Sequence, residues 1–131
     1  MNNDVTMNRL ANTKNRFQTE AKRVLCLCSA GLLRSPTTAN VLHQEYGYNT
    51  RAAGVNEEYA LVRVDPVLLE WADEIVCVEK SVFLDLQYHW NDLTKDKKIV
   101  VMNIPDQYEW NNPTLRAFIK KQYDDVTIME S

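Results

Sequence analysis

Cys28 and Arg34 are the residues whose types and spacing are best suited to chemistry. Five residues separate them, and the pair stands where an apolar run ends and a helical pattern begins. An ionised cysteine sulfur is a polarisable nucleophile. An arginine guanidinium is always charged and can offer two parallel N–H donors to two oxygens of one phosphoryl group. The pair therefore predicts attack by the Cys28 sulfur on a phosphoryl group that Arg34 holds.

The interval between the two residues suits a tight anion-binding loop. In such a loop, successive backbone N–H groups point into one concavity, and the N-terminus of the following helix adds its positive end. Gly31 suits the positive φ that a sharp curl requires. The amides expected to bind phosphate are those of Ser29, Ala30, Gly31, Leu32 and Leu33. Ser35, directly after the arginine, is expected to donate its hydroxyl to the Cys28 sulfur.

The other two cysteines, Cys26 and Cys77, are expected to be structural. Both lie within apolar runs, where cysteine usually packs as a small hydrophobic side chain. An odd number of cysteines outside a secretory context indicates reduced thiols. The chain has no C-x2-C pair, and His43 and His89 stand alone, so we expect no metal site.

Four short apolar runs predict strands, and helical patterns alternate with them. The predicted strands are Val24–Cys28, Thr50–Ala53, Ile75–Glu79 and Ile99–Asn103. The predicted helices are Pro36–Tyr46, Asp65–Ala72, Ser81–His89, with Ser81 as its cap, and Pro113–Tyr123. Three strands are nearly continuous in apolar residues, as in a parallel sheet buried on both faces, and the second is weaker and expected at an edge. The pattern predicts an α/β fold, a three-layer sandwich with a four-stranded parallel sheet flanked by helices.

A general acid is needed where an ester oxygen leaves, and Asp106 is the best candidate. It follows the predicted strand Ile99–Asn103 by three residues. Because the carboxyl ends of parallel strands share one edge of the sheet, Asp106 is expected near the Cys28 loop. The alternative is that Asp106 only caps a turn after Pro105. Asp65 is a second candidate acid, but an Asp before a proline is more typical of a helix cap.

Composition limits the class of protein. The chain has 131 residues and a net charge of −3, which predicts one domain without a basic surface for nucleic acid or anionic lipid. No apolar stretch is long enough to span a membrane, and the polar N-terminal segment lacks the core of a secretory signal. We therefore expect a cytoplasmic protein with a flexible arm over residues 1–20 and a single α/β domain over 21–131.

The segment VLCLCSAGLLRSPTTANVL resembles the active-site signature V-C-x5-R-S-P of the low-molecular-weight protein tyrosine phosphatase family. RAAG, LLEWADEIVCVEK and IPDQYEW are similar to later parts of the family in the same order, most of all to short bacterial members. The resemblance implies a four-stranded parallel sheet with flanking helices. It also implies hydrolysis of phosphate monoesters through a cysteinyl-phosphate, without metal or other cofactor. Cys28 would be the nucleophile, Arg34 the phosphate clamp and Ser35 the hydroxyl that supports the thiolate.

The resemblance also implies roles for the late segment IPDQYEW. Asp106 would be the acid that protonates the leaving group. Tyr108 and Trp110 stand where family members carry aromatics that line the substrate cleft, although packing of both side chains onto the sheet is an equal alternative. The expected partner is a phosphorylated protein, with phosphotyrosine as the first choice, or a small phosphoester. The sequence does not predict an oligomeric state.

Two rival functions remain open at the level of sequence. The first is arsenate reduction on the same scaffold, which would need a relay of cysteines beyond Cys28. Only Cys26 and Cys77 are present for such a relay. The second is a non-catalytic module that binds phosphate or a phosphoprotein. A binding module needs neither a nucleophile nor a proton donor, so the presence of both favours an enzyme.

Overall fold

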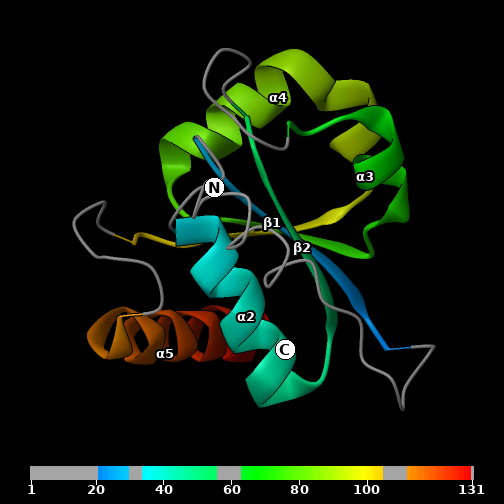
Figure 1. Ribbon diagram of the computed structural model, residues 1–131. Helices are drawn as coiled ribbons and strands as arrows, with labels where there is room; N and C mark the ends of the chain where they lie inside the picture. The colour runs from blue at the N-terminus through cyan, green and yellow to red at the C-terminus, as the bar shows by residue number, and fades with distance from the viewer. Residues whose placement is uncertain (1–20, 30–33, 56–62, 105–111, 131) are drawn as a thin grey trace, which may run out of the picture.

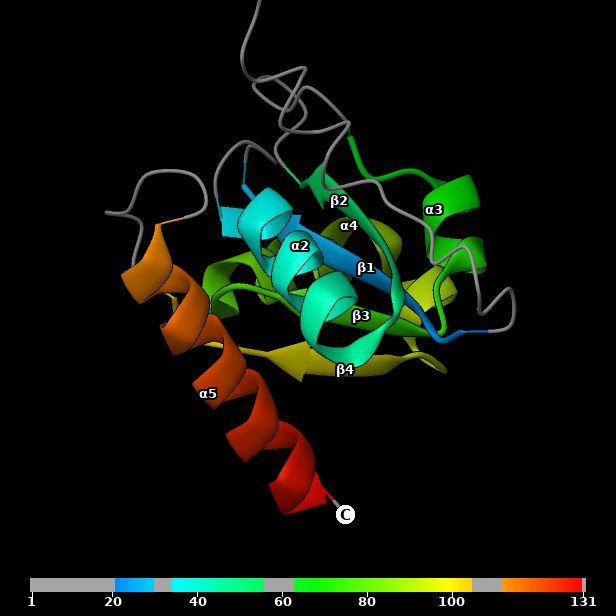
Figure 2. The ribbon, with the colours of Figure 1, turned by 60° about the horizontal axis from the view of Figure 1, so that its bottom comes forward.

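A parallel sheet with strand order β2-β1-β3-β4 forms the centre of the molecule (Figure 2). The computed structural model describes residues 21–29, 34–55, 63–104 and 112–130. In this part of the chain the strands are β1 (Arg23–Cys28), β2 (Asn49–Gly54), β3 (Glu74–Cys77) and β4 (Lys98–Val101). The expected N-terminal arm, residues 1–20, lies outside the described residues.

Helices cover both faces of the sheet and complete three layers. The helices of the described part are α2 (Arg34–Tyr46), α3 (Pro66–Trp71), α4 (Lys80–Thr94) and α5 (Pro113–Glu130). Figure 1 shows α3 and α4 on one face and α2 and α5 on the other. The predicted three-layer α/β sandwich with a four-stranded parallel sheet is therefore confirmed.

The core follows from the apolar strand runs. All residues of β3 and five of the six residues of β1 are buried, as the continuous apolar runs predict for central parallel strands. On α5, Leu115, Ile119 and Tyr123 recur every four residues and are buried, so one stripe of this helix packs on the core. The strand order puts β2 at an edge, as its weaker pattern predicted.

The order in which the chain adds strands to the sheet reverses at β1: β2 is added on one side of it, and β3 and then β4 on the other. Its neighbours are β2 and β3, and the connection to β2 runs through α2 on one face, whereas the connection from β2 to β3 runs through α3 on the other (Figure 1). In open parallel sheets, ligands bind beyond the carboxyl ends of the strands at such a switch point. Cys28 is the last residue of β1 and therefore lies at this position.

The predicted cap of the third helix was wrong. The strand β3 ends at Cys77, two residues before the predicted end, and Glu79 is the N-cap residue of α4. The Glu79 carbonyl accepts hydrogen bonds from the backbone N–H groups of Val82 and Phe83, so the helix begins before Ser81. A serine can cap only from the position before the first helical residue, and Ser81 already lies inside the helix.

Two other helix ends agree with local sequence signals. The Asp65 carboxylate accepts a hydrogen bond from the Leu68 N–H at 2.8 Å and caps α3. This confirms Asp65 as a cap residue. At the end of α2, Gly47 has a φ of 72°, a backbone conformation that glycine adopts without steric cost, and its N–H donates to the His43 carbonyl.

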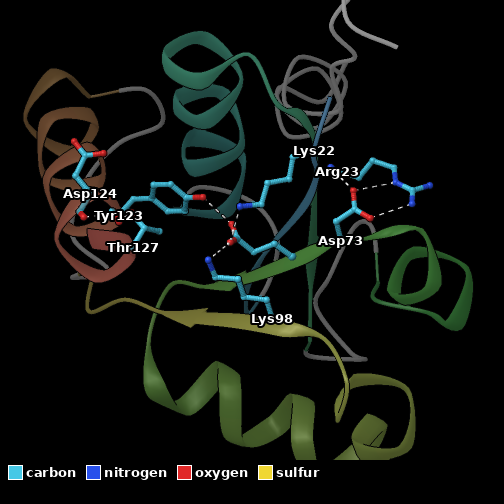
Figure 3. Close-up of polar contacts among 8 residues, drawn as sticks. Lys22, Arg23, Asp73, Lys98, Tyr123, Asp124 and Thr127 are labelled. Carbon is cyan, nitrogen blue, oxygen red and sulfur yellow. Dashed lines mark hydrogen bonds and ion pairs between the residues drawn. The ribbon is translucent and has the colours of Figure 1, made fainter. Parts of the chain in front are cut away.

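A buried carboxylate ties the strands together at their N-terminal ends, opposite the end that holds Cys28. Glu74 opens β3 and is fully buried; its carboxylate lies 2.9 Å from the Lys22 Nζ and 3.5 Å from the Lys98 Nζ and accepts a hydrogen bond from the Tyr123 hydroxyl. Figure 3 shows Lys22, Lys98 and Tyr123 pointing toward this carboxylate from three sides. Burial and the hydrogen bond to Glu74 raise the pKa of Tyr123, which keeps its hydroxyl a donor. Because an unpaired buried charge is costly, these contacts fix β1, β3, β4 and α5 in one register.

Candidate active site

Cys28 and Ser35 meet at the carboxyl end of β1. The Cys28 Sγ lies 3.1 Å from the Ser35 Oγ, and both residues are buried. Ser35 is in the first turn of α2, so the sulfur sits beside the N-terminus of a 13-residue helix. The Ser35 Oγ also lies 3.4 Å from the Ala53 carbonyl oxygen, to which it donates. The hydroxyl can turn its proton from this carbonyl to the sulfur.

Arg34 opens α2, and its guanidinium is held at the same edge of the sheet. Its Nη1 donates to the Ile104 carbonyl at 3.1 Å and lies 3.1 Å from the Glu79 Oε1. The side chain is buried, with 6% of its surface exposed. Contacts that come from the ends of two different strands leave the guanidinium little freedom to rotate. A guanidinium fixed in advance in this way loses little entropy when it binds an oxyanion.

Glu79 is a site residue that the sequence analysis did not identify. It lies two residues after the end of β3 and is half-buried, and its side chain makes no capping hydrogen bond to α4. Its carboxylate pairs instead with Arg34. The sequence does carry a signal, because Glu79 is the acidic residue that follows the third apolar run, and the ends of all parallel strands share one edge. The predicted strand Ile75–Glu79 included Glu79 as its last residue, whereas β3 ends at Cys77.

The predicted site residues fall into two groups. Cys28, Arg34 and Ser35 are brought together, and Ser29 follows Cys28 as a half-buried residue at the start of the loop. The other predicted site residues lie outside the described part of the chain: Ala30, Gly31, Leu32, Leu33, Asp106, Tyr108 and Trp110.

The described residues on either side of positions 105–111 make defined hydrogen bonds. Before these positions, the Ile104 N–H donates to the Val78 carbonyl at 2.9 Å, and the Ile104 carbonyl accepts from Arg34. After them, the Asn112 side chain accepts hydrogen bonds from the N–H groups of Thr114 and Leu115 at the start of α5. Ile104 thus lies at the end of the sheet that holds Cys28 and Arg34.

Cys26 and Cys77 lie in the interior, as predicted. Both are buried and free of disulfides. Burial raises the pKa of Cys77 to about 12 and raises the pKa of Cys26 well above its ordinary value, where the charge of Glu74 adds to the effect. Both side chains therefore carry thiols at neutral pH. Of the described residues, no three His, Cys, Asp or Glu side chains gather in a way that could hold a metal ion.

We expect iodoacetate to distinguish the three cysteines in the folded protein. Only the thiolate reacts, so Cys26 and Cys77, whose pKa values burial raises, should stay unmodified until the protein unfolds, whereas Cys28 should be carboxymethylated. Inorganic phosphate should slow the reaction of Cys28. Peptide mass spectrometry after timed quenching measures each site. Equal rates at all three cysteines, or no protection by phosphate, would contradict the assignment of Cys28 to an anion site.

Several solved structures share this fold. The tyrosine phosphatase Wzb from Escherichia coli K30, in complex with phosphate, aligns with a TM-score of 0.63 and 14% identity over 85% of this chain and 99% of its own. The YwlE arginine phosphatase from Geobacillus stearothermophilus aligns with a TM-score of 0.61 and 16% identity over 82% of this chain and 90% of its own. Wzb from Vibrio vulnificus, in complex with benzylphosphonate, has a TM-score of 0.60 and 17% identity, covering 83% and 96%.

At these identities the likeness is one of fold. The chain has the α/β fold of these phosphatase structures, as the sequence resemblance implied. Sequence comparison adds nothing to this result, since no family profile and no curated sequence matches the chain. In the described part, no helix is long and apolar enough to cross a membrane.

Proposed function

We propose that the protein is a phosphate-monoester hydrolase of the low-molecular-weight tyrosine phosphatase type. The observation that carries the proposal is the convergence of three groups at the switch point of the sheet. The Cys28 sulfur lies 3.1 Å from the Ser35 hydroxyl, and the neighbouring Arg34 guanidinium is fixed by the Ile104 carbonyl. A buried nucleophile, a hydroxyl that supports its thiolate and a preorganised cation are together suited to phosphoryl transfer.

In the first step of the proposed reaction, the Cys28 thiolate attacks phosphorus in line with the ester oxygen. Arg34 and the loop amides of residues 29–33 bind the non-bridging oxygens, where negative charge is spread in the transition state. A sulfur–phosphorus bond forms as the phosphorus–oxygen ester bond breaks. Asp106, which is protonated at the start of this step, gives its proton to the leaving oxygen, so the alcohol or phenol departs as a neutral molecule.

In the second step, water hydrolyses the cysteinyl-phosphate. Asp106, now a carboxylate, takes a proton from the water as its oxygen attacks phosphorus. The sulfur–phosphorus bond breaks and Cys28 leaves as a thiolate. Ser35 donates its hydroxyl to this sulfur as charge returns to it, which makes the sulfur a better leaving group. Inorganic phosphate is then released, and the enzyme returns to its starting state.

For the substrate we propose a phosphorylated protein, with phosphotyrosine as the first choice and a small phosphoester as the alternative. Tyr108 and Trp110 follow the acid in sequence and would form an aromatic wall beside a phenyl ring. The similar structures include proteins named as tyrosine phosphatases and as an arginine phosphatase, so phosphoarginine belongs in the same assay.

The cysteine arrangement supports ester hydrolysis over arsenate reduction. Paired residues of neighbouring strands point to the same face, and Cys77 pairs with Leu27, the residue before Cys28. Cys77 therefore points to the face opposite Cys28. Cys26 shares the face of Cys28 but is fully buried within β1. Neither thiol is available for a relay that passes an oxidised sulfur to solvent.

Release of nitrophenolate from p-nitrophenyl phosphate by the purified protein tests the proposed function. We expect turnover without added metal and in the presence of a chelator, with competitive inhibition by phosphate and vanadate. Phosphotyrosine, phosphoserine and phosphoarginine peptides then rank the substrates by kcat/KM. Binding of phosphate or vanadate without turnover of any substrate would contradict the hydrolase and favour the binding module. Arsenate-dependent oxidation of a thiol cofactor would favour the reductase.

Replacing Asp106 by asparagine is expected to lower kcat by about a hundredfold for phenyl phosphate. Asparagine keeps the size of the side chain but has no proton to give. The loss should be much smaller for p-nitrophenyl phosphate, because nitrophenolate leaves without protonation. Measuring kcat for a series of aryl phosphates gives its dependence on leaving-group pKa. Asp65→Asn is the matched control, since Asp65 caps α3, and it should leave that dependence unchanged. A uniform loss across the series would contradict the role of Asp106.

A further inference from the structure

Gln122 on α5 holds Asn103, which lies two residues after the end of β4. Its Oε1 accepts a hydrogen bond from the Asn103 N–H at 2.7 Å, and its Nε2 donates to the Asn103 carbonyl at 2.8 Å. Only one orientation of the side-chain amide satisfies both bonds, since the N–H needs an acceptor and the carbonyl needs a donor. Two bonds to one residue fix both the position of Asn103 and the rotation of its backbone.

The contact between Gln122 and Asn103 lies one residue from the Ile104 carbonyl, which orients the Arg34 guanidinium. The next residue, Ile104, donates its N–H to the Val78 carbonyl, and its own carbonyl accepts from the Arg34 Nη1 at 3.1 Å. Rotation of the chain at Asn103 would therefore move the acceptor away from the guanidinium. Met102 and Ile104, on either side of Asn103, are buried and donate their N–H groups to the Cys77 and Val78 carbonyls, whereas Asn103 itself is exposed. Gln122 adds the constraint on the Asn103 backbone from outside the strand.

Helix α5 is a rigid support for such a constraint. Leu115, Ile119 and Tyr123 anchor it in the core, and Tyr123, next to Gln122, donates to the buried Glu74. Arg116 also binds the Asn40 side chain on α2, at 2.7 Å. A positioning group is most effective when its own side chain comes from a fixed element, because a shift of about 1 Å can cost about a hundredfold in rate.

We propose that Gln122 is a positioning residue for the phosphate site. It fixes the Asn103 backbone, which sets the Ile104 carbonyl in place to orient the Arg34 guanidinium toward a bound phosphoryl group. The inference rests on the proposed function of the same site. It assigns Gln122 no contact with the substrate. A merely structural tie between α5 and β4 is the alternative.

Gln122→Met separates these two roles. Methionine has a similar length and a similar helix propensity but makes neither hydrogen bond. Lys121→Met is the matched control: it makes the same change one residue earlier, at a side chain that is 80% exposed. The dissociation constant of inorganic phosphate is measured by isothermal titration, together with Tm, kcat and KM for p-nitrophenyl phosphate. Hydrogen exchange at the Asn103 amide reports the local effect directly.

For Gln122→Met we expect phosphate to bind about tenfold more weakly and kcat/KM to fall at least as much. Exchange of the Asn103 amide should quicken. Because Asn103 is exposed, water replaces the lost hydrogen bonds, and Tm should change by no more than about 4 °C. Lys121→Met should stay within about twofold of wild type in every measurement.

Phosphate affinity of Gln122→Met equal to that of wild type would overturn the inference. A loss of affinity that comes with a fall in Tm of more than about 10 °C would also overturn it, by assigning Gln122 to folding. A wild-type protein that binds phosphate but hydrolyses no ester would contradict the proposed function alone. In that case the ratio of the two phosphate dissociation constants still decides the role of Gln122.

Discussion

Replacing Cys28 by serine is expected to lower kcat for p-nitrophenyl phosphate by at least about ten-thousandfold. A serine hydroxyl stays protonated where a thiol ionises, so the variant has no nucleophile for the first step. The phosphate site should survive, because the loop amides and the Arg34 guanidinium are unchanged. Isothermal titration should therefore give a phosphate affinity for Cys28→Ser close to that of wild type.

Cys26→Ala is the matched control for this experiment. Cys26 lies two residues earlier on the same face of β1 and is fully buried, so its replacement disturbs the same strand without touching the sulfur of Cys28. Its turnover should stay within a few-fold of wild type. Retained activity in Cys28→Ser, or loss of activity in Cys26→Ala with an unchanged Tm, would show that the nucleophile has been assigned to the wrong sulfur.

Replacing Arg34 by lysine is expected to lower kcat/KM by about a thousandfold. Lysine keeps the positive charge but is a single point donor, so it cannot present a fork to two phosphoryl oxygens. The Arg34 Nη1 makes both the contact with the Ile104 carbonyl and the contact with the Glu79 carboxylate, and lysine has no second nitrogen to offer the phosphoryl group. Phosphate should bind more weakly as well, which distinguishes this variant from Cys28→Ser.

Arg116→Lys controls for the general cost of exchanging arginine for lysine between two elements. Arg116 on α5 forks onto the Asn40 and Gln44 side chains of α2, at 2.7 and 2.9 Å. Its replacement should change Tm by a few degrees and leave kcat/KM near that of wild type. If Arg34→Lys kept both phosphate affinity and turnover, Arg34 would be a structural arginine, and the anion site would have to be sought elsewhere.

Features that depend on neighbours in the chain could be predicted from the sequence alone. The runs buried on both faces identified β1 and β3, and the alternation of strands with helical patterns predicted the parallel sheet. The placement of Cys28, Arg34 and Ser35 around one turn could also be predicted, because a strand end and the helix start after a short loop must lie close together. The Asp65 cap of α3 is a further local feature, because it depends on a hydrogen bond between two residues that are three positions apart.

Features that join distant parts of the chain were decided only by the tertiary structure. The Ile104 carbonyl that orients Arg34 is 70 residues further along the chain, and the Glu79 carboxylate comes from the end of another strand. Gln122 and Glu74 likewise take their roles from partners on other elements. Hydrophobic periodicity reports which face of an element is buried, but it does not report which elements become neighbours. Strand order and helix packing set those neighbours, so the groups that hold the arginine in place appear only once the sheet is assembled.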